Sequence, residues 1–255
     1  MYVAELSFLV IGDTSYSAAE TAIRHYLEAL IFRGQMLGRE MPTYFQQDRF
    51  VSRVQLPAPD ALLQQHHSER GLSALQQLGA AGLALPKLNV LGEDLMANHT
   101  DPCKAPSALI LYSRFALQNS PVYCAEHFAP VPLYQLAPRV DFEALIRWQL
   151  QYQALDEIQM QQHSVLLKSA ERALQQPNSQ LNQTGRNLAR QLSKLCNKPV
   201  YYALYRGSSA DCATETDRRC PGCGAQWRLT ESWHQLFDFR CDHCQLVSNI
   251  AWQCQ

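Results

Sequence analysis

The sequence has little charge, no long hydrophobic run and almost no excess of either charge sign. Charged residues make up 18% of the 255 residues, below the usual share of about 25%, and glutamine takes much of their place. With 22 Lys and Arg against 23 Asp and Glu, the formal net charge is −1. This balance excludes a protein that attracts nucleic acid through its overall charge, although it permits a local basic patch.

Targeting and membrane signals are also missing. No stretch approaches the run of about 18 apolar residues that spans a membrane, and the N-terminus lacks the basic region of a signal peptide. The nine cysteines are an odd number and four of them stand in two close pairs, which favours a metal site over a secreted disulfide framework. We therefore expect a cytoplasmic protein without a membrane partner.

Familiar catalytic motifs are absent as well. The sequence holds no phosphate-binding loop, no GxSxG elbow and no HExxH helix. Asp156 and Glu157 are adjacent, so they point in different directions on a helix and do not form a carboxylate pair. We expect neither an enzyme nor a small-molecule substrate, and an enzyme would require a pocket of convergent titratable groups within residues 1–138.

The remaining patterns predict an α+β protein in three parts. Residues 1–138 predict an α/β domain, with a ferredoxin-like topology as one arrangement, followed at its end by a Pro-rich connector. Residues 139–206 predict helices and then a half-buried strand over 199–206, whose aromatic and β-branched residues suit such a strand. Residues 207–255 predict a separate ribbon with four cysteines.

In the first part, apolar alternation from Tyr2 to Ile11 predicts a strand. A capping box at Ser17 and a left-handed cap at Gly34 are expected to bound the next helix. Further elements are expected as strands near 50–56, 83–91 and 108–112 and a helix over 60–78.

Two cysteine pairs form the strongest motif, Cys220 with Cys223 and Cys241 with Cys244. Their spacing, Cys-x2-Cys-x17-Cys-x2-Cys, is that of a zinc ribbon. Two intervening residues let one tight turn aim both sulfurs at the same ion, and four thiolates close a tetrahedral site. One structural Zn²⁺ per chain is therefore expected. Iron in a rubredoxin-like site and His243 as a substitute ligand are the alternatives.

Three residues offer a second set of ligands. Cys124 and His127 have the spacing of a metal-binding turn and Cys103 lies upstream, but no fourth ligand is evident in the sequence. Buried thiols beside a polar histidine are the alternative. The remaining pair that flanks the ribbon, Cys212 and Cys254, is expected to be free thiols.

The indication of nucleic-acid binding is local. Between Asn178 and Pro199 there are four basic residues and no acidic one. Arg186, Arg190 and Lys194 are spaced four apart, so they lie on one helix face, where they can follow phosphates. A solvated face near a helix C-terminus is the alternative.

Five ribbon residues are further candidates for contact with a single strand: Arg218, Arg219, Trp227, Arg228 and Arg240. An indole ring can stack on a base while arginines neutralise phosphates. Residues 200–255 nevertheless hold five basic and six acidic residues, a balance that suits a protein partner equally well. RNA or DNA binding is the leading functional hypothesis, and a protein–protein adaptor stabilised by zinc is the alternative.

The whole chain also resembles a known group of sequences. The resemblance rests on the start MYVAELSFLV, on PVPLY at 130–134, on PVYYALYR at 199–206, and on the CPGCG and FDFRCDHCQLVSN segments around the paired cysteines. The similar group is a bacterial family of unknown function described as zinc-ribbon-containing, with a conjectured nucleic-acid-binding role. The resemblance implies zinc ligands at the four paired cysteines and names no catalytic residue.

Overall fold

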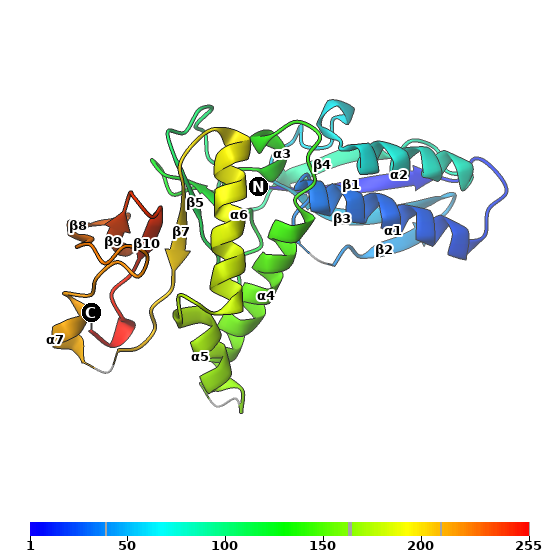
Figure 1. Ribbon diagram of the computed structural model, residues 1–255. Coiled ribbons are helices and arrows are strands. Elements are labelled where there is room, and N and C mark those ends of the chain that lie inside the picture. Colours follow the sequence, from blue (N-terminus) through cyan, green and yellow to red (C-terminus); the bar gives the residue numbers. More distant parts are fainter. Residues whose placement is uncertain (39, 163–164, 210, 255) are drawn as a thin grey trace. The chain divides into compact units, whose positions relative to one another are not determined.

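The computed structural model describes residues 1–38, 40–162, 165–209 and 211–254, which form two compact units (Figure 1). The first unit comprises Met1–Pro102, Gln118–Ser120 and Ala129–Glu143. The second comprises Cys103–Leu117, Pro121–Phe128 and Ala144–Gln255. Neither unit is one continuous stretch of chain.

The first unit is a four-stranded antiparallel sheet with helices packed on one face. Its elements are β1 (Tyr2–Leu9), α1 (Tyr16–Arg33), β2 (Thr43–Gln46), β3 (Arg49–Leu56), the 3-10 turn η1 (Gln64–His66), α2 (Glu69–Ala80), β4 (Lys87–Glu93) and α3 (Leu133–Leu136). The strand order is β2-β3-β1-β4, and every pairing is antiparallel. The helices α1 and α2 contact each other (Figure 1).

The alternation of apolar side chains in β1 shows which face of the sheet lines the core of this unit. Ala4, Leu6 and Phe8 are buried in one cluster with Leu30 of α1 and Leu78 of α2, because alternate side chains of a strand point to one face. The prediction of a strand with this buried face is confirmed.

The ends of α1 follow the rules for helix caps, with one correction. The helix begins after Ser15, whose Oγ accepts a hydrogen bond from the amide of Ala18, so the N-cap is not Ser17. It ends at Gly34, whose φ of 75° is the left-handed conformation that glycine adopts without strain.

A buried arginine holds the Pro-rich connector to this unit. Arg33 is 1% exposed, and its guanidinium donates hydrogen bonds to the carbonyl oxygens of His66, Tyr134, Ala137 and Val140. Each acceptor oxygen lies 2.7–2.9 Å from its donor nitrogen. The segment that looked like a loose connector in the sequence is therefore fixed by charge-assisted hydrogen bonds.

The second unit is a six-stranded mixed sheet with helices. Its elements are β5 (Leu109–Leu111), β6 (Val122–Cys124), α4 (Glu143–Met160, from Ala144 onward), α5 (Leu167–Gln175), α6 (Gln180–Cys196), β7 (Val200–Leu204), α7 (Cys212–Glu215), β8 (Arg228–Trp233), β9 (Phe237–Cys241), β10 (Leu246–Ser248) and the 3-10 turn η2 (Trp252–Cys254). The strand order is β6-β5-β7-β10-β9-β8. No described helix of the chain is long and apolar enough to cross a membrane.

The strand β7 is buried on both faces, whereas the sequence predicted a half-buried strand. On one face, Tyr202 donates a hydrogen bond to Asn182 of α6 and packs beside Trp148 of α4. On the other face, Tyr201 and Ala203 join a second apolar cluster with residues of β5, β6, β9 and β10. This strand is the centre of the second unit.

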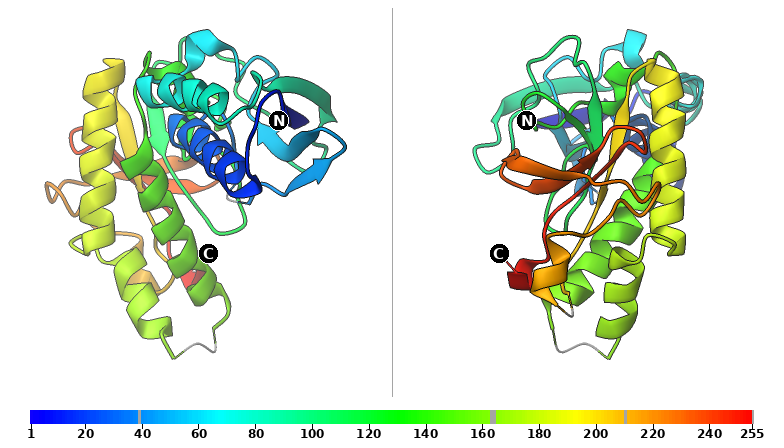
Figure 2. Two further views of the ribbon diagram at one scale, coloured as in Figure 1. Left: turned by 90° about the vertical axis from the view of Figure 1, so that its right-hand side faces the viewer. Right: turned by 60° about the vertical axis from the view of Figure 1, so that its left-hand side comes forward.

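Two expectations about the sheets are corrected by the strand pairing. The strand expected near 108–112 is β5, which pairs in parallel with β7 of the second unit and does not complete the first sheet. The ribbon is not a separate layer either, because β10 pairs in parallel with β7 and antiparallel with β9. The cysteine-bearing hairpin therefore extends a sheet that begins far upstream, as two views show (Figure 2).

Candidate functional site

The four paired cysteines converge at one point in the second unit. The Sγ atoms of Cys220, Cys223, Cys241 and Cys244 all lie within 4.8 Å of one another, and those of Cys223 and Cys241 are 3.7 Å apart. Cys220 and Cys241 are buried, while Cys223 is exposed. The hairpin of β8 and β9 brings the two pairs together, as the spacing predicts.

Backbone geometry around the cysteines fits a metal-binding turn. The amide of Gly222 lies 3.4 Å from Sγ of Cys220, and the amide of Cys244 lies 3.4 Å from Sγ of Cys241. A Cβ atom at Gly222 would lie 2.6 Å from Sγ of Cys244, so only glycine fits there. Gly224 has a φ of 73°, a conformation that favours glycine.

The ionisation of the four cysteine thiols favours a bound cation. A hydrogen bond from the backbone amide of Ala225 lowers the pKa of Cys223, whereas burial raises the pKa of Cys241 and of Cys244. Four thiolates in one small volume repel one another unless an ion neutralises them, and metal binding displaces their protons. The donor set and geometry fit a tetrahedral all-sulfur metal site, for which zinc is a suitable ion.

Trp227 lies inside the ribbon. It is 3% exposed, its indole Nε1 donates to the carbonyl oxygen of Arg218 at 2.8 Å, and its ring packs beside Phe239 with centroids 5.2 Å apart. The Arg218 guanidinium lies over both rings. The indole is therefore part of the ribbon core and is not presented for stacking on a nucleic-acid base.

Arg240 also makes contacts within the unit. Its guanidinium carbon lies 4.8 Å from the ring centroid of Tyr201 and 4.6 Å from that of Trp233. Its Nε forms an ion pair with Asp242 at 2.6 Å. Of the five ribbon residues predicted to contact nucleic acid, Arg219 and Arg228 are the exposed ones.

The basic residues of α6 differ in their exposure. Arg186 is half-buried, whereas Arg190 and Lys194 are exposed. Arg190 donates to the side-chain oxygen of Asn187 at 2.6 Å. The buried face of the helix includes Leu181, Leu188 and Leu192, so the outward face carries Arg190 and Lys194.

Cys212 and Cys254 form a disulfide, and the expectation of two free thiols is wrong. Their Cα atoms are 5.2 Å apart although 42 positions separate them in the sequence. The bond joins α7 to η2 at the C-terminal end of the ribbon. The sequence did not predict this disulfide, because the two cysteines are far apart in the chain. In addition, α7 and η2 are short elements without a periodic pattern that could indicate where they lie.

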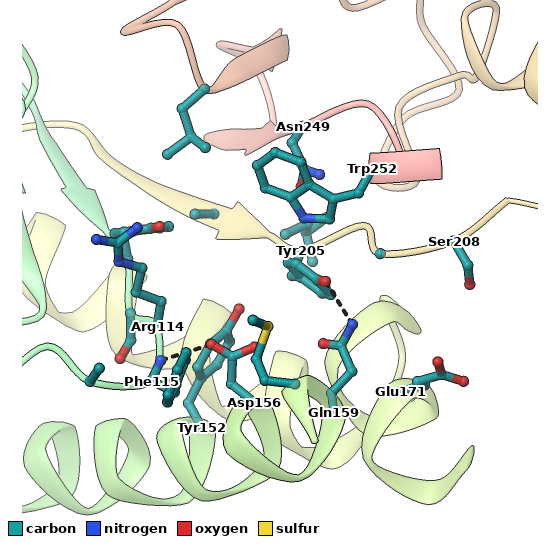
Figure 3. Close-up of a pocket in the computed structure, with 18 of the residues that line it drawn as sticks. Arg114, Phe115, Tyr152, Asp156, Gln159, Glu171, Tyr205, Ser208, Asn249 and Trp252 are labelled. Atoms are coloured by element: carbon teal, nitrogen blue, oxygen red, sulfur yellow. Dashed lines mark hydrogen bonds between the residues drawn. The ribbon is translucent and has the colours of Figure 1, made fainter. Parts of the chain in front are cut away.

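A cavity of about 860 Å³ opens within the second unit, between α4, the end of β7 and the C-terminal turn (Figure 3). Asp156 and Gln159 of α4 point into it, and Gln159 Nε2 donates to the hydroxyl of Tyr205 at 2.7 Å. The backbone amide of Phe115 donates to Asp156 at 2.8 Å. A volume of this size is typical of small-ligand pockets.

Buried polar groups line this cavity. Burial raises the pKa of Asp156, against the opposing effects of the Phe115 amide and Arg114. Among the described residues, Oε1 of Gln159 and Oγ of Ser113 have no hydrogen-bond partner. Sequence reasoning missed this site, although a carboxylate four positions after the apolar Tyr152 on one helix face was a signal for it.

The fold and the cysteine cluster define an α+β protein with two sheets and a C-terminal four-cysteine cluster that fits a metal site. Models of domains of unknown function match 1–92 (DUF8589), 103–205 (DUF2310) and 209–254 (DUF8594). An uncharacterized protein of Haemophilus influenzae is 32% identical over 259 residues, which cover 99% of each chain. A second uncharacterized protein of that organism is 34% identical over 174 residues, covering 67% of this chain and 85% of its own length. No solved structure matches the chain.

The chain therefore belongs to the family of these uncharacterized Haemophilus proteins, a family of unknown function marked by the DUF8589, DUF2310 and DUF8594 domains. The four-cysteine cluster in its last domain fits a zinc ribbon.

Proposed function

We propose that this chain is a non-catalytic zinc-ribbon protein that binds single-stranded RNA or DNA through a basic face of its second unit. The zinc is structural, because all four of its ligands come from the chain and leave no open position. The family resemblance noted for the sequence, with its conjectured nucleic-acid role, agrees with this proposal.

The exposed face of α6 is the main observation that supports this proposal. The stretch from 178 to 199 has no acidic residue, and the helix presents Arg190 and Lys194 outward while its leucines are buried. Arg219 and Arg228 are the exposed bases of the ribbon in the same unit. Exposed basic side chains attract phosphates, so these four residues are the proposed contacts.

Fluorescence anisotropy with labelled single-stranded RNA and DNA of mixed sequence tests the proposal, at about 50 and about 200 mM salt. We expect binding that weakens as salt rises. Lys194→Glu should weaken it and lower the slope of log K against log salt by about 0.7 for each lost phosphate contact. Lys87→Glu, at an exposed lysine of β4 in the first unit, is the matched control and should leave both unchanged. Absence of binding below about 100 µM at low salt contradicts the proposal.

A protein–protein adaptor is the second candidate, and the ribbon itself supports it. Arg218 and Arg240 are engaged in contacts within the unit, which leaves the ribbon with less free positive charge than its sequence indicates. A tagged full-length chain that retains one specific protein partner after nuclease treatment, but no nucleic acid before it, would favour the adaptor.

The first unit supports a finer description of its fold. Its element order is strand, helix, two strands, helix and strand, and its sheet order is β2-β3-β1-β4 with antiparallel pairs throughout. This is the split arrangement of a ferredoxin-like unit, and we propose that topology for residues 1–93.

A further inference from the structure

We propose that Cys103, Cys124 and His127 bind a second zinc ion, at a site independent of the ribbon and of any nucleic-acid role. The two Sγ atoms and a ring nitrogen of His127 lie within 4.8 Å of one another. All three residues belong to the second unit, and sulfur with imidazole nitrogen is a donor set that zinc prefers.

The local fold builds this cluster. Cys124 is the last residue of β6 and pairs with Leu109 of β5, so it lies beside the strand that Cys103 precedes. The chain then turns sharply, and the amide of Phe128 donates to the carbonyl oxygen of Cys124 at 3.0 Å. The turn brings His127 Nδ1 to 3.7 Å from Sγ of Cys124.

The charge around the cluster favours a cation. The Cys124 thiol donates a hydrogen bond to the carboxylate of Glu126 at 2.9 Å, and Ser107 holds that carboxylate in place by donating from its backbone amide at 2.7 Å and from its hydroxyl. A buried thiol beside a fixed carboxylate is an unfavourable place for a thiolate unless a metal ion binds there.

The two cysteines of this cluster remain thiols. Neither Cys103 nor Cys124 forms a disulfide, although their sulfurs are neighbours, whereas Cys212 and Cys254 are bonded in the same unit. A Cys2His set leaves one coordination position for a fourth donor. The carboxylate of Glu126, which lies 2.9 Å from Sγ of Cys124, is an oxygen donor within the same unit.

The second site also lies beside the ribbon hairpin. The carbonyl oxygen of Ala125 accepts a hydrogen bond from Nε2 of His234, at 2.8 Å, and the His234 ring stacks on Phe128 with centroids 5.1 Å apart. His234 follows β8 directly. A metal ion that fixes the 124–128 turn therefore also supports the turn that joins the ribbon strands.

Elemental analysis of the full-length protein, purified with zinc and without chelator, tests the second site. Two zinc ions per chain are expected in the wild type, and one in Cys103→Ser and in His127→Ala. His127 is exposed, so its replacement should leave the far-ultraviolet circular dichroism unchanged. The matched control Cys196→Ser, at a cysteine outside both clusters that forms no disulfide, should keep two ions.

This experiment tests the two proposed metal sites independently. One zinc in the wild type that both Cys103→Ser and His127→Ala retain overturns the second site and leaves the ribbon assignment intact. A disulfide between Cys103 and Cys124, found by mass spectrometry of the unreduced protein, overturns it as well. Loss of one ion in Cys103→Ser but none in Cys223→Ser supports the second site and contradicts the ribbon.

Discussion

Replacing Trp227 with phenylalanine distinguishes a structural indole from a nucleic-acid contact. Trp227→Phe removes the hydrogen bond from Nε1 to the carbonyl oxygen of Arg218, which contributes about 1 kcal/mol. The smaller ring leaves a void of about 40 Å³ in a site that is 3% exposed, and at about 24 cal/mol per Å³ this costs about 1 kcal/mol more. Phenylalanine keeps the contact with the arginine, so the expected total loss is about 2 kcal/mol.

Urea unfolding of the zinc-loaded protein, followed by circular dichroism, measures this loss. The matched control is Trp252→Phe, at a tryptophan that is 50% exposed, where the change should stay near 0.5 kcal/mol. Affinity for single-stranded RNA should be the same in Trp227→Phe and the wild type. An unchanged urea midpoint together with weaker RNA binding would refute the structural assignment of Trp227.

Three further predictions concern the second unit. Because burial raises the pKa of Asp156, its contribution to stability is present at low pH and is lost as pH rises toward the raised value. The stability advantage of Asp156→Asn over the wild type should therefore grow as pH rises above about 4 in urea titrations. Gly185→Ala should cost about 1–3 kcal/mol, since its Cβ would lie 2.2 Å from the Tyr202 ring, whereas Gly79→Ala in α2 meets nothing within 4 Å and should not destabilise. Thiol titration of the unreduced protein in denaturant with chelator should count the seven free cysteines, and a count of nine would disprove the disulfide near the C-terminus.

Local sequence patterns predicted the parts of this structure that depend on neighbouring residues. The alternation in β1, the glycine cap of α1, the leucine face of α6 and the convergence of the paired cysteines all agree with the structure. Each follows from a period of two or 3.6 residues, or from the geometry of a tight turn. The metal cluster of the ribbon was therefore predictable from the sequence.

Features that depend on distant segments were not predictable in this way. The parallel pairing of β5 with β7 joins segments about 90 residues apart in the chain, and only the fold shows that β7 is buried on both faces. No sequence pattern indicated that Arg33 bonds three carbonyl oxygens in and just beyond the Pro-rich connector and a fourth at His66. The packing of Trp227 and Arg240 within the second unit was not predicted for a related reason, since aromatic and arginine side chains suit a ribbon interior as well as a nucleic-acid surface.

An anomalous-difference map at the zinc edge, from crystals grown without added chelator, tests the four-cysteine metal site most directly. We expect a peak among the Sγ atoms of Cys220, Cys223, Cys241 and Cys244, about 2.3 Å from each sulfur. Absence of a peak at that point, with the four cysteines joined in disulfides or left as free thiols, would contradict the assignment of the ribbon as a zinc site.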